Sequence, residues 1–422
     1  MGKFVGYICS LCRTEYAPGE VTYTCPKDGG NLDVVLDYDA IKAKYQPEDI
    51  LSRHDPSLWR YLPLLPVPVP PGESTPLHAA GGTPVFRLPR LAAKLGLQNL
   101  WLKDESKNPT ASFKDRASAI VVARAQELKS EIIVTASTGN AGAALAGMVA
   151  AVGQKAVIFA PKYAPQAKVA QLLIFGAKVI LVNGTYDDAF DLSIQASNEF
   201  GWYCRNTGYN PFTTEGKKTA AFEIWEWWQA THAKWHEEFG DDLDHAPLTV
   251  FVSVGDGNII SGIHKGFKDL YQLGWMPRIP RIIGVQAEGS AAISNAFHDN
   301  TETITPVSAK TIADSISVDL PRDGIRAVRA VKETDGTYVN VSDAEILNAI
   351  AELGQVGVFA EPAGAAAYAG VVKAIASGVV KSADPILVLN TGSGLKDVRA
   401  ALSAVESPPI IKPTLKALKR LL

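Results

Sequence analysis

From about residue 80 to residue 400, short apolar runs alternate with longer Ala-rich or amphipathic stretches. Each run has the length and β-branched content of a strand, whereas the stretches between them have the length of helices. The expected strands are 99–103, 131–137, 155–161, 178–184, 247–255, 281–288 and 385–392, and the expected helices are 115–128, 141–152, 165–175, 185–199, 215–231 and 342–353. Such alternation predicts parallel sheets covered by helices on both faces, and two sheets in two α/β lobes account for the strand count.

Segments of different character flank this α/β body. Residues 1–36, with three closely spaced cysteines, are predicted to form a small separate knuckle with two short strands. Residues 37–80 are predicted to be a connector that ends in the Pro-rich stretch 61–76, which we expect to be extended because proline disfavours helices and central strands. We expect the body to span 81–405, with a smaller lobe at roughly 117–215. The last segment, 406–422, is predicted to carry a basic amphipathic helix that docks on the body or contacts another subunit.

Composition narrows the classes of partner. The 422 residues carry a formal net charge of -3, with acidic and basic side chains spread along the chain, which argues against nucleic acid as the main partner. No apolar run is long enough for a membrane span, and the first residues lack a signal-peptide pattern. The four cysteines do not form a disulfide framework for a chain of this size, so we expect a cytoplasmic protein.

Four turns that follow expected strands are rich in Gly, Ser, Thr and Asn. They read NPTASFKDR (108–116), TASTGNAG (135–142), VGDGNIISG (254–262) and LNTGSGLKD (389–397). Ligands of parallel α/β folds bind at this end of the strands. The third turn is neither a Walker A loop nor a GxGxxG fingerprint, so it predicts a site for a single phosphate at a helix N-terminus.

Lys114 lies near the start of an expected helix, where a cation is unfavourable. That placement lowers the pKa of an amine and leaves it neutral for attack on a carbonyl carbon. The local sequence alone fits a solvated surface lysine as well. Likewise, the other three turns taken singly fit capped helices without a ligand.

A spacing of CxxC-x12-C joins Cys9, Cys12 and Cys25, and Asp28 occupies the position of a fourth ligand. This pattern is close to that of a zinc ribbon. A zinc ion held by three thiolates and a carboxylate is one interpretation, and a degenerate ribbon held by packing is the other.

In combination, these segments resemble the β-family (fold type II) pyridoxal-phosphate (PLP) enzymes, and among them the threonine synthases, over roughly residues 80–400. NPTASFKDR is similar to the lysine motif of that family, STGNAG to its asparagine segment, GDGNIISG to its phosphate loop and TGSGLKD to a threonine-synthase segment. FAEPAGAA, with Glu361, is similar to the EPA segment of the family, and the cysteine knuckle stands where many threonine synthases carry a zinc-ribbon-like start.

The resemblance implies roles for individual residues. It implies that Lys114 is the catalytic, Schiff-base lysine and that Asn140 holds the cofactor's ring oxygen. It implies that Thr391 faces the ring nitrogen and that the cofactor phosphate binds Gly255, Asp256, Gly257, Asn258 and Ile259. The substrate-binding residues that it implies are Ser112, Ser137, Thr138, Lys168 and Asn210.

The activity implied is that of a carbon–oxygen lyase acting on phosphates, which converts O-phospho-L-homoserine and water to L-threonine and phosphate. Enzymes of this type are usually dimers or larger homo-oligomers. The sequence departs from the family pattern at three places. Ala111 stands for the usual Gly, a mild change that tightens the turn. Ser393 stands where many threonine synthases have His, and TIADSISVDLPR (311–322) replaces a TIATAI segment; these two departures concern the substrate more than the cofactor. The alternatives are a threonine or serine ammonia-lyase, a cysteate-synthase-like β-replacement enzyme, or a non-catalytic module that binds a small metabolite.

Overall fold

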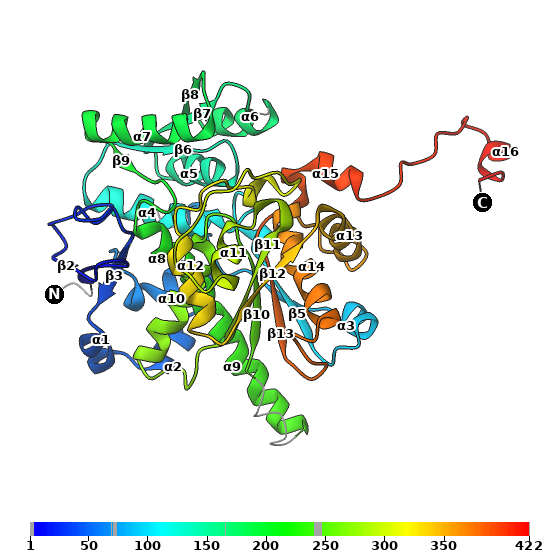
Figure 1. Cartoon of the computed structure of the whole chain (residues 1–422), viewed down its shortest axis with the longest axis horizontal. Coiled ribbons are helices and arrows are strands. Elements are labelled where there is room, and N and C mark those ends of the chain that lie inside the picture. The colour runs from blue at the N-terminus through cyan, green and yellow to red at the C-terminus, as the bar shows by residue number, and fades with distance from the viewer. Residues whose placement is uncertain (1–3, 69, 71–73, 165, 240–246, 422) are drawn as a thin grey trace.

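A computed structural model of the chain describes residues 4–68, 70, 74–164, 166–239 and 247–421. These residues form two α/β lobes and a small antiparallel sheet at the N-terminus (Figure 1). The α/β class with two parallel sheets is therefore confirmed.

The larger sheet has six strands in the order β12-β11-β10-β13-β5-β4. The strands are β4 (Val85–Arg87), β5 (Leu100–Asp104), β10 (Thr249–Ser253), β11 (Arg281–Ala287), β12 (Thr337–Val341) and β13 (Ile386–Asn390). All neighbours run parallel except β4, which pairs antiparallel with β5 at one edge. The central strands β5, β10 and β13 are buried along their whole length, which explains why they read as continuous apolar runs.

The smaller sheet has four parallel strands in the order β8-β7-β6-β9. They are β6 (Ile132–Ala136), β7 (Lys155–Pro161), β8 (Lys178–Val182) and β9 (Tyr203–Cys204). The chain enters this lobe after β5 and returns to the larger sheet at β10, so the strand ends of both sheets meet between the lobes (Figure 1).

The helices cover both sheets, and some of them begin at a side-chain cap. Their bounds are α1 (Tyr38–Lys44), α2 (Pro47–Leu51), α3 (Pro89–Leu95), α4 (Lys114–Glu127), α5 (Asn140–Ala151), α6 (Gln166–Ile174), α7 (Tyr186–Phe200), α8 (Phe212–Lys217), α9 (Thr219–Phe239), α10 (Asn258–Gln272), α11 (Ala292–His298), α12 (Gly324–Lys332), α13 (Asp343–Gly354), α14 (Pro362–Ala376), α15 (Val398–Ser403) and α16 (Leu415–Leu418). Capping boxes formed by Thr185 with Asp188 and by Ser342 with Glu345 start α7 and α13. Among the described residues, none of the helices is both long and apolar enough to cross a membrane.

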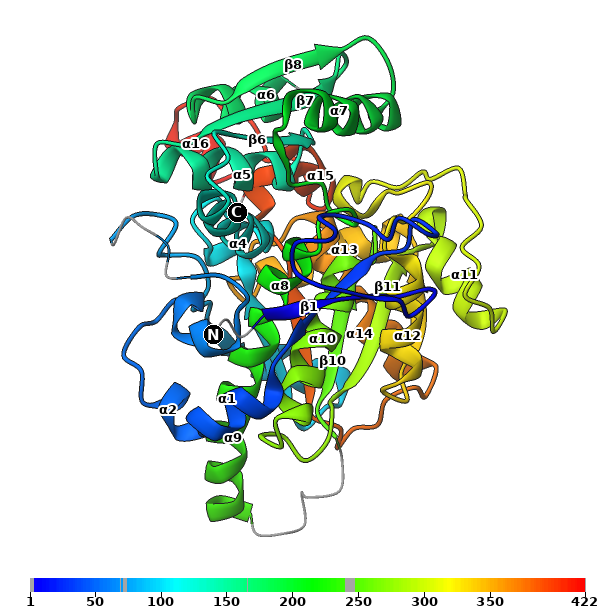
Figure 2. The same cartoon turned by 90° about the vertical axis from the view of Figure 1, so that its left-hand side faces the viewer.

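The N-terminal knuckle contains three strands rather than the two expected. They are β1 (Phe4–Cys9), β2 (Glu15–Tyr16) and β3 (Leu32–Leu36), paired antiparallel in the order β2-β1-β3. Figure 2 shows this sheet lying against the body beside α8 and α12 rather than standing apart from it. Tyr7, Leu32 and Val34 are buried in the same core cluster as α8 and α10.

The structure departs from two expectations about the flanking segments. Leu58–Leu64 of the connector forms a 3-10 helix (η1) that includes Pro63, and Tyr61 packs against Phe222 of α9 with ring centroids 5.2 Å apart. Short 3-10 turns tolerate proline, and burial of their apolar side chains makes this stretch part of the core rather than an extended linker. The C-terminal helix is only α16, none of whose residues is buried, and Figure 1 shows it away from the body. It therefore does not dock on the body, and its contact with another subunit stays a prediction.

Candidate active site

A pocket between the two lobes collects residues from all four predicted turns. It is lined by Phe113, Lys114, Asn140, Thr207, Ser253, Val254, Gly255, Asp256, Gly257, Asn258, Ile259, Ile260, Ser315, Ile316, Glu361 and Thr391. Every residue that the sequence resemblance assigned to the cofactor lies in this set. The turns are distant in sequence, and they meet because parallel strands of both sheets end at the same place.

Lys114 is the first residue of α4 and is half-buried in the pocket wall. No hydrogen bond or ion pair joins its amine to a described residue. Burial, with a further contribution from the buried cation Arg205, lowers the pKa of Lys114 to about 8, against the opposing effect of Asp256 and Glu361. The amine therefore has a substantial neutral fraction near neutral pH, as a nucleophile requires.

The loop Gly255–Ile259 lines the pocket and leads into helix α10. Gly257 caps helix α10 with φ of +90°, a conformation that favours glycine, and a Cβ there would meet the carbonyl oxygen of Asp323 at 2.5 Å. The N–H groups that begin α10 have no partner within the helix, so they form a ready site for an anion. Ser253, on the preceding strand, has a buried hydroxyl with no hydrogen-bond partner among the described residues.

Asn140 begins α5 on the opposite side of the pocket. Its side-chain amide donates hydrogen bonds to both carboxylate oxygens of Glu361, at 2.8 and 3.0 Å. Burial raises the pKa of Glu361. This pair joins the smaller lobe to the turn before α14, so Asn140 is held at the pocket by a contact across the lobes.

The Lys114 turn packs against the turn after β13. The N–H of Phe113 donates to the carbonyl of Thr391 at 2.9 Å, and the N–H of Ser393 donates to the carbonyl of Ala111 at 3.1 Å. Thr391 is thereby placed beside Lys114, and the fully buried Ser112 has a hydroxyl without a described partner. Ala111 adopts φ of +62°, a left-handed conformation that favours glycine. The substitution of the usual Gly therefore strains the turn.

The predicted substrate residues fall into two groups. Ser112, Ser137 and Thr138 belong to the turns that reach the pocket, and Thr138 and Lys168 line an adjoining pocket together with Asn140, Glu361 and Lys396. Lys168 forms an ion pair with the exposed Asp314 of the other lobe. Ser112, Ser137 and Asn210 are not among the residues that line either pocket. The side-chain polar atoms of Asn210 are taken up by neighbouring backbone groups: its amide donates to the carbonyl of Cys204 and its oxygen accepts from the N–H of Phe212. We therefore leave Asn210 out of the candidate site.

Comparison with known proteins agrees with this geometry. Residues 77–392 match the family model described as pyridoxal-phosphate dependent enzyme. The threonine synthase of Methanocaldococcus jannaschii is 38% identical over 418 residues, which are 98% of each chain, and that of Methanosarcina acetivorans is 36% identical over 97% of each chain. The chain belongs to the threonine synthase family of pyridoxal-phosphate-dependent enzymes.

Solved structures share the fold of this threonine synthase family member. The processed form of threonine deaminase isoform 2 from Solanum lycopersicum superimposes with a TM-score of 0.64 at 23% identity, over 81% of this chain and 92% of the other. Diaminopropionate ammonia lyase from Escherichia coli gives a TM-score of 0.62 at 22% identity, over 76% and 87% of the two chains. These similarities bear on the fold alone.

Several pocket residues of this family member were not predicted from the sequence. Ser253 is the last residue of β10, Thr207 lies just after β9, and Ser315 belongs to the segment that departs from the usual threonine-synthase pattern. The polar end of a buried strand was a signal for Ser253. Ser315 and Ile316 show that the departing segment forms one wall of the pocket, so this departure changes the lining of the pocket.

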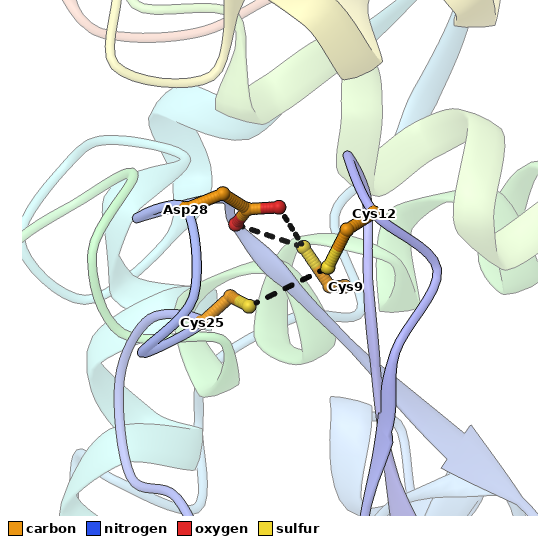
Figure 3. A group of neighbouring side chains, drawn as sticks. All are labelled: Cys9, Cys12, Cys25 and Asp28. Atoms are coloured by element: carbon orange, nitrogen blue, oxygen red, sulfur yellow. Dashed lines mark hydrogen bonds between the residues drawn. The ribbon is translucent and has the colours of Figure 1, made fainter.

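The cysteine knuckle lies away from this pocket. Figure 3 shows Cys9, Cys12, Cys25 and Asp28 pointing toward a common centre from two hairpin turns. One ligand atom from each lies within 4.8 Å of all the others. The Sγ atoms of Cys12 and Cys25 are 3.7 Å apart, and Cys9 donates to Asp28 at 3.3 Å.

Proposed function

We propose that this protein converts O-phospho-L-homoserine and water to L-threonine and phosphate. The observation that carries the proposal is the half-buried Lys114 amine, with its lowered pKa, facing the Gly255–Ile259 loop across an interlobe pocket. Similarity to threonine synthases along almost the full chain supports this choice of substrate.

The residues of the pocket fit PLP. The unpaired Lys114 amine suits its aldehyde carbon, the loop of Gly255, Asp256, Gly257, Asn258 and Ile259 suits its phosphate, and Asn140 and Thr391 suit the polar positions of its ring. The buried, unpartnered hydroxyls of Ser112 and Ser253 are the kind of polar group that a ligand completes. When bound, PLP withdraws electrons from the substrate and stabilises negative charge on its carbon atoms.

The remaining chemistry belongs to residues of the chain. Lys114 in its neutral form accepts the proton from the α-carbon of the substrate. A threonine hydroxyl at position 391 cannot neutralise a pyridinium as a carboxylate would, which favours elimination and replacement over transamination. In the overall reaction the bond from the γ-carbon to the phosphate oxygen breaks, and water supplies the hydroxyl group at the β-carbon.

We propose Ser112, Ser137, Thr138 and Lys168 as the substrate-binding residues. Their hydroxyls and amine are the donors that carboxylate and phosphate oxygens require. Asp314 is exposed and pairs with Lys168 across the lobes, so a substrate phosphate that displaces Asp314 would gain a cation already directed at the cleft.

The test is to incubate the PLP-loaded protein with O-phospho-L-homoserine and to measure phosphate and threonine together. Equal amounts of both products support the proposal. Phosphate with 2-oxobutanoate in place of threonine would indicate an elimination enzyme of the ammonia-lyase type. The absence of a lysine-bound chromophore after addition of PLP would indicate a metabolite-binding module instead.

We also propose that Cys9, Cys12, Cys25 and Asp28 bind one zinc ion. Tetrahedral zinc with bonds of about 2.3 Å to sulfur separates its ligand atoms by about 3.8 Å, close to the spacings observed here. Elemental analysis of the purified protein should find about one zinc per chain. Cys12→Ser should lose the metal, whereas Cys204→Ala, at a buried cysteine in the smaller lobe, should retain it.

We further propose a cytoplasmic homodimer or larger homo-oligomer. Biosynthesis of an amino acid from a phosphorylated precursor suits the cytoplasm. Light scattering of the full chain measures the assembly, and a mass equal to one chain would contradict this part of the proposal.

A further inference from the structure

A buried arginine joins the N-terminal knuckle to the catalytic body. Arg326 of α12 donates to Asp33 of strand β3 at 2.6 Å, and the same guanidinium donates to both oxygens of Asp323, at 2.6 and 2.8 Å. Arg326 is only 8% exposed and Asp323 is fully buried. One planar cation is thus shared between a carboxylate of the knuckle and a carboxylate beside the pocket, with charge-assisted bonds on both sides.

Asp323 in turn holds the loop that faces Lys114. It accepts a hydrogen bond from the side-chain amide of Asn258 at 2.7 Å, and its own N–H donates to the carbonyl of Asp256 at 3.0 Å. The preceding N–H, of Arg322, donates to the Asp256 carboxylate at 2.6 Å. Residues 322 and 323 are therefore hydrogen-bonded to the loop on both sides of Gly257, at Asp256 and at Asn258.

In addition to these hydrogen bonds, the backbones of Gly257 and Asp323 pack closely together. A Cβ on Gly257 would lie 2.5 Å from the Asp323 carbonyl oxygen, so the two backbones are in direct contact. A shift of Asp323 is then transmitted to the N–H groups that begin α10. The side chain of Asn258 is also fixed by Thr213 and Lys217, so Asp323 is one of several fixed supports on which the loop rests.

We infer that the knuckle sets the geometry of the Gly255–Ile259 loop through Arg326, with Asp33 and Asp323 as positioning residues for the cofactor phosphate. This inference rests on the proposed role of the loop in holding that phosphate. Its consequence is that a residue on an edge strand of the small N-terminal sheet controls the affinity of the active site for PLP. If the link were purely structural, breaking it would lower the free energy of unfolding and would weaken the binding of PLP and of pyridoxal equally.

The experiment compares Asp33→Asn with Asp39→Asn in the full chain. Asp39 is an exposed carboxylate near the start of α1, so its change removes the same charge without touching Arg326. The measurement is the dissociation constant of the apoenzyme for PLP and for pyridoxal, which lacks the phosphate, followed by the absorbance of the lysine-bound cofactor. We expect Asp33→Asn to weaken PLP binding about tenfold and to leave pyridoxal binding within about twofold, and Asp39→Asn to change neither.

Two further variants test the route. In an Asp323→Asn background, Asp33→Asn should add less than about twofold, because residues that act through one another are not additive. Arg326→Lys keeps the charge but cannot make the same fork of bonds, so it should reproduce the selective loss of PLP binding even where Asp33→Asn lowers expression.

The outcomes separate this inference from the proposed function. If the wild-type protein binds PLP and pyridoxal equally well, the loop does not hold the phosphate and both ideas fail. If the wild-type protein requires the phosphate but Asp33→Asn and Arg326→Lys bind PLP as tightly as it does, only the inference about the knuckle is overturned. Equal weakening of PLP and pyridoxal in Asp33→Asn would also overturn it, since that result indicates a general loss of structure.

Discussion

Two cations two residues apart on helix α4, the buried Arg116 and the half-buried Lys114, have opposite environments. Arg116 bonds to Glu105 at 2.7 Å and to Glu223 at 2.7 Å, and Lys103 completes this Arg116 network by pairing with Glu223. Burial alone would lower the pKa of Arg116, but the two carboxylates outweigh it and hold that pKa above its usual range. Lys114 faces the pocket, has no such partner, and has its pKa lowered to about 8.

This difference indicates that the charge of Arg116 serves the stability of the fold, whereas the amine of Lys114 stays available for chemistry. The Arg116 network joins β5, α4 and α9, and its charges compensate one another. Around Lys114, the hydroxyls of Ser112 and Ser253 are also without described partners. Buried polar groups are usually paired, so a group of unpaired ones in a pocket indicates a place for a ligand.

The largest effect should come from removing the unpaired cation. Lys114→Ala should lower kcat for threonine formation about 10⁴-fold, because both the attachment of the cofactor and the proton acceptor are lost. Its unfolding free energy should stay within about 1 kcal/mol of the wild type, since no described bond is broken. Lys107→Ala is the matched control on the exposed side of the same turn. Full activity in Lys114→Ala would remove the basis of the proposed function.

Removing the paired cation should do the reverse. Arg116→Ala should destabilise the protein by about 3–5 kcal/mol, because it leaves the carboxylates of Glu105 and Glu223 buried without their main partner. Chemical denaturation measures this effect, and Glu127→Ala, which breaks an exposed ion pair on the same helix, should cost less than about 1 kcal/mol. A small decrease in the free energy of unfolding of Arg116→Ala would mean that Glu105 and Glu223 can lose their main partner without destabilising the protein.

The pH dependence of cofactor capture should report the lowered pKa of Lys114. The neutral amine is the reactive form, so the rate at which apoenzyme captures PLP should rise with pH. With a pKa of about 8, the rise is about tenfold between pH 7 and pH 9, followed by a plateau. An amine with the ordinary lysine pKa would give a rise of about a hundredfold over this range and no plateau, and stopped-flow absorbance distinguishes the two profiles.

The smallest expected effect concerns Ala111, in the turn that precedes Lys114 and Arg116. Ala111→Gly should stabilise the protein by about 1 kcal/mol, because a left-handed φ of +62° costs alanine more than glycine. Thermal unfolding at constant PLP concentration measures it. An unchanged or lowered midpoint would show that the entropy lost by the more flexible glycine offsets the relief of strain.

Much of the fold was predictable because its signals are local. All seven expected strands and five of the six expected helices are present, since buried parallel strands and amphipathic helices leave their marks within a few residues. The sixth expected helix, 215–231, is divided at Lys218 between α8 and α9. The sequence missed β4, β9 and β12. Strand β9 is only two residues long, and it exists because Tyr203 and Cys204 pair with β6 of the smaller sheet. A pattern that short carries no periodicity.

The motifs of the candidate site were predictable from the sequence, but the groups that each of its residues contacts were not. The resemblance implies that Asn210 binds the substrate, yet Asn210 lines neither pocket, and its amide donates to the carbonyl of Cys204. Ser315 had no motif, yet it lines the pocket because the segment around it packs against Gly255. In both cases the decisive neighbour lies outside the local pattern.

The sequence by itself determined the order of strands and helices, the four polar turns and the lysine among them, because these depend on residues close together in the chain. The tertiary structure alone decided which cation of α4 is neutralised and which remains reactive. Glu105 and Glu223 reach Arg116 from a turn after β5 and from α9, and Asp33 reaches Arg326 from the knuckle. Electrostatic environment depends on burial and on distances through space, and neither can be read from the spacing of residues along a chain.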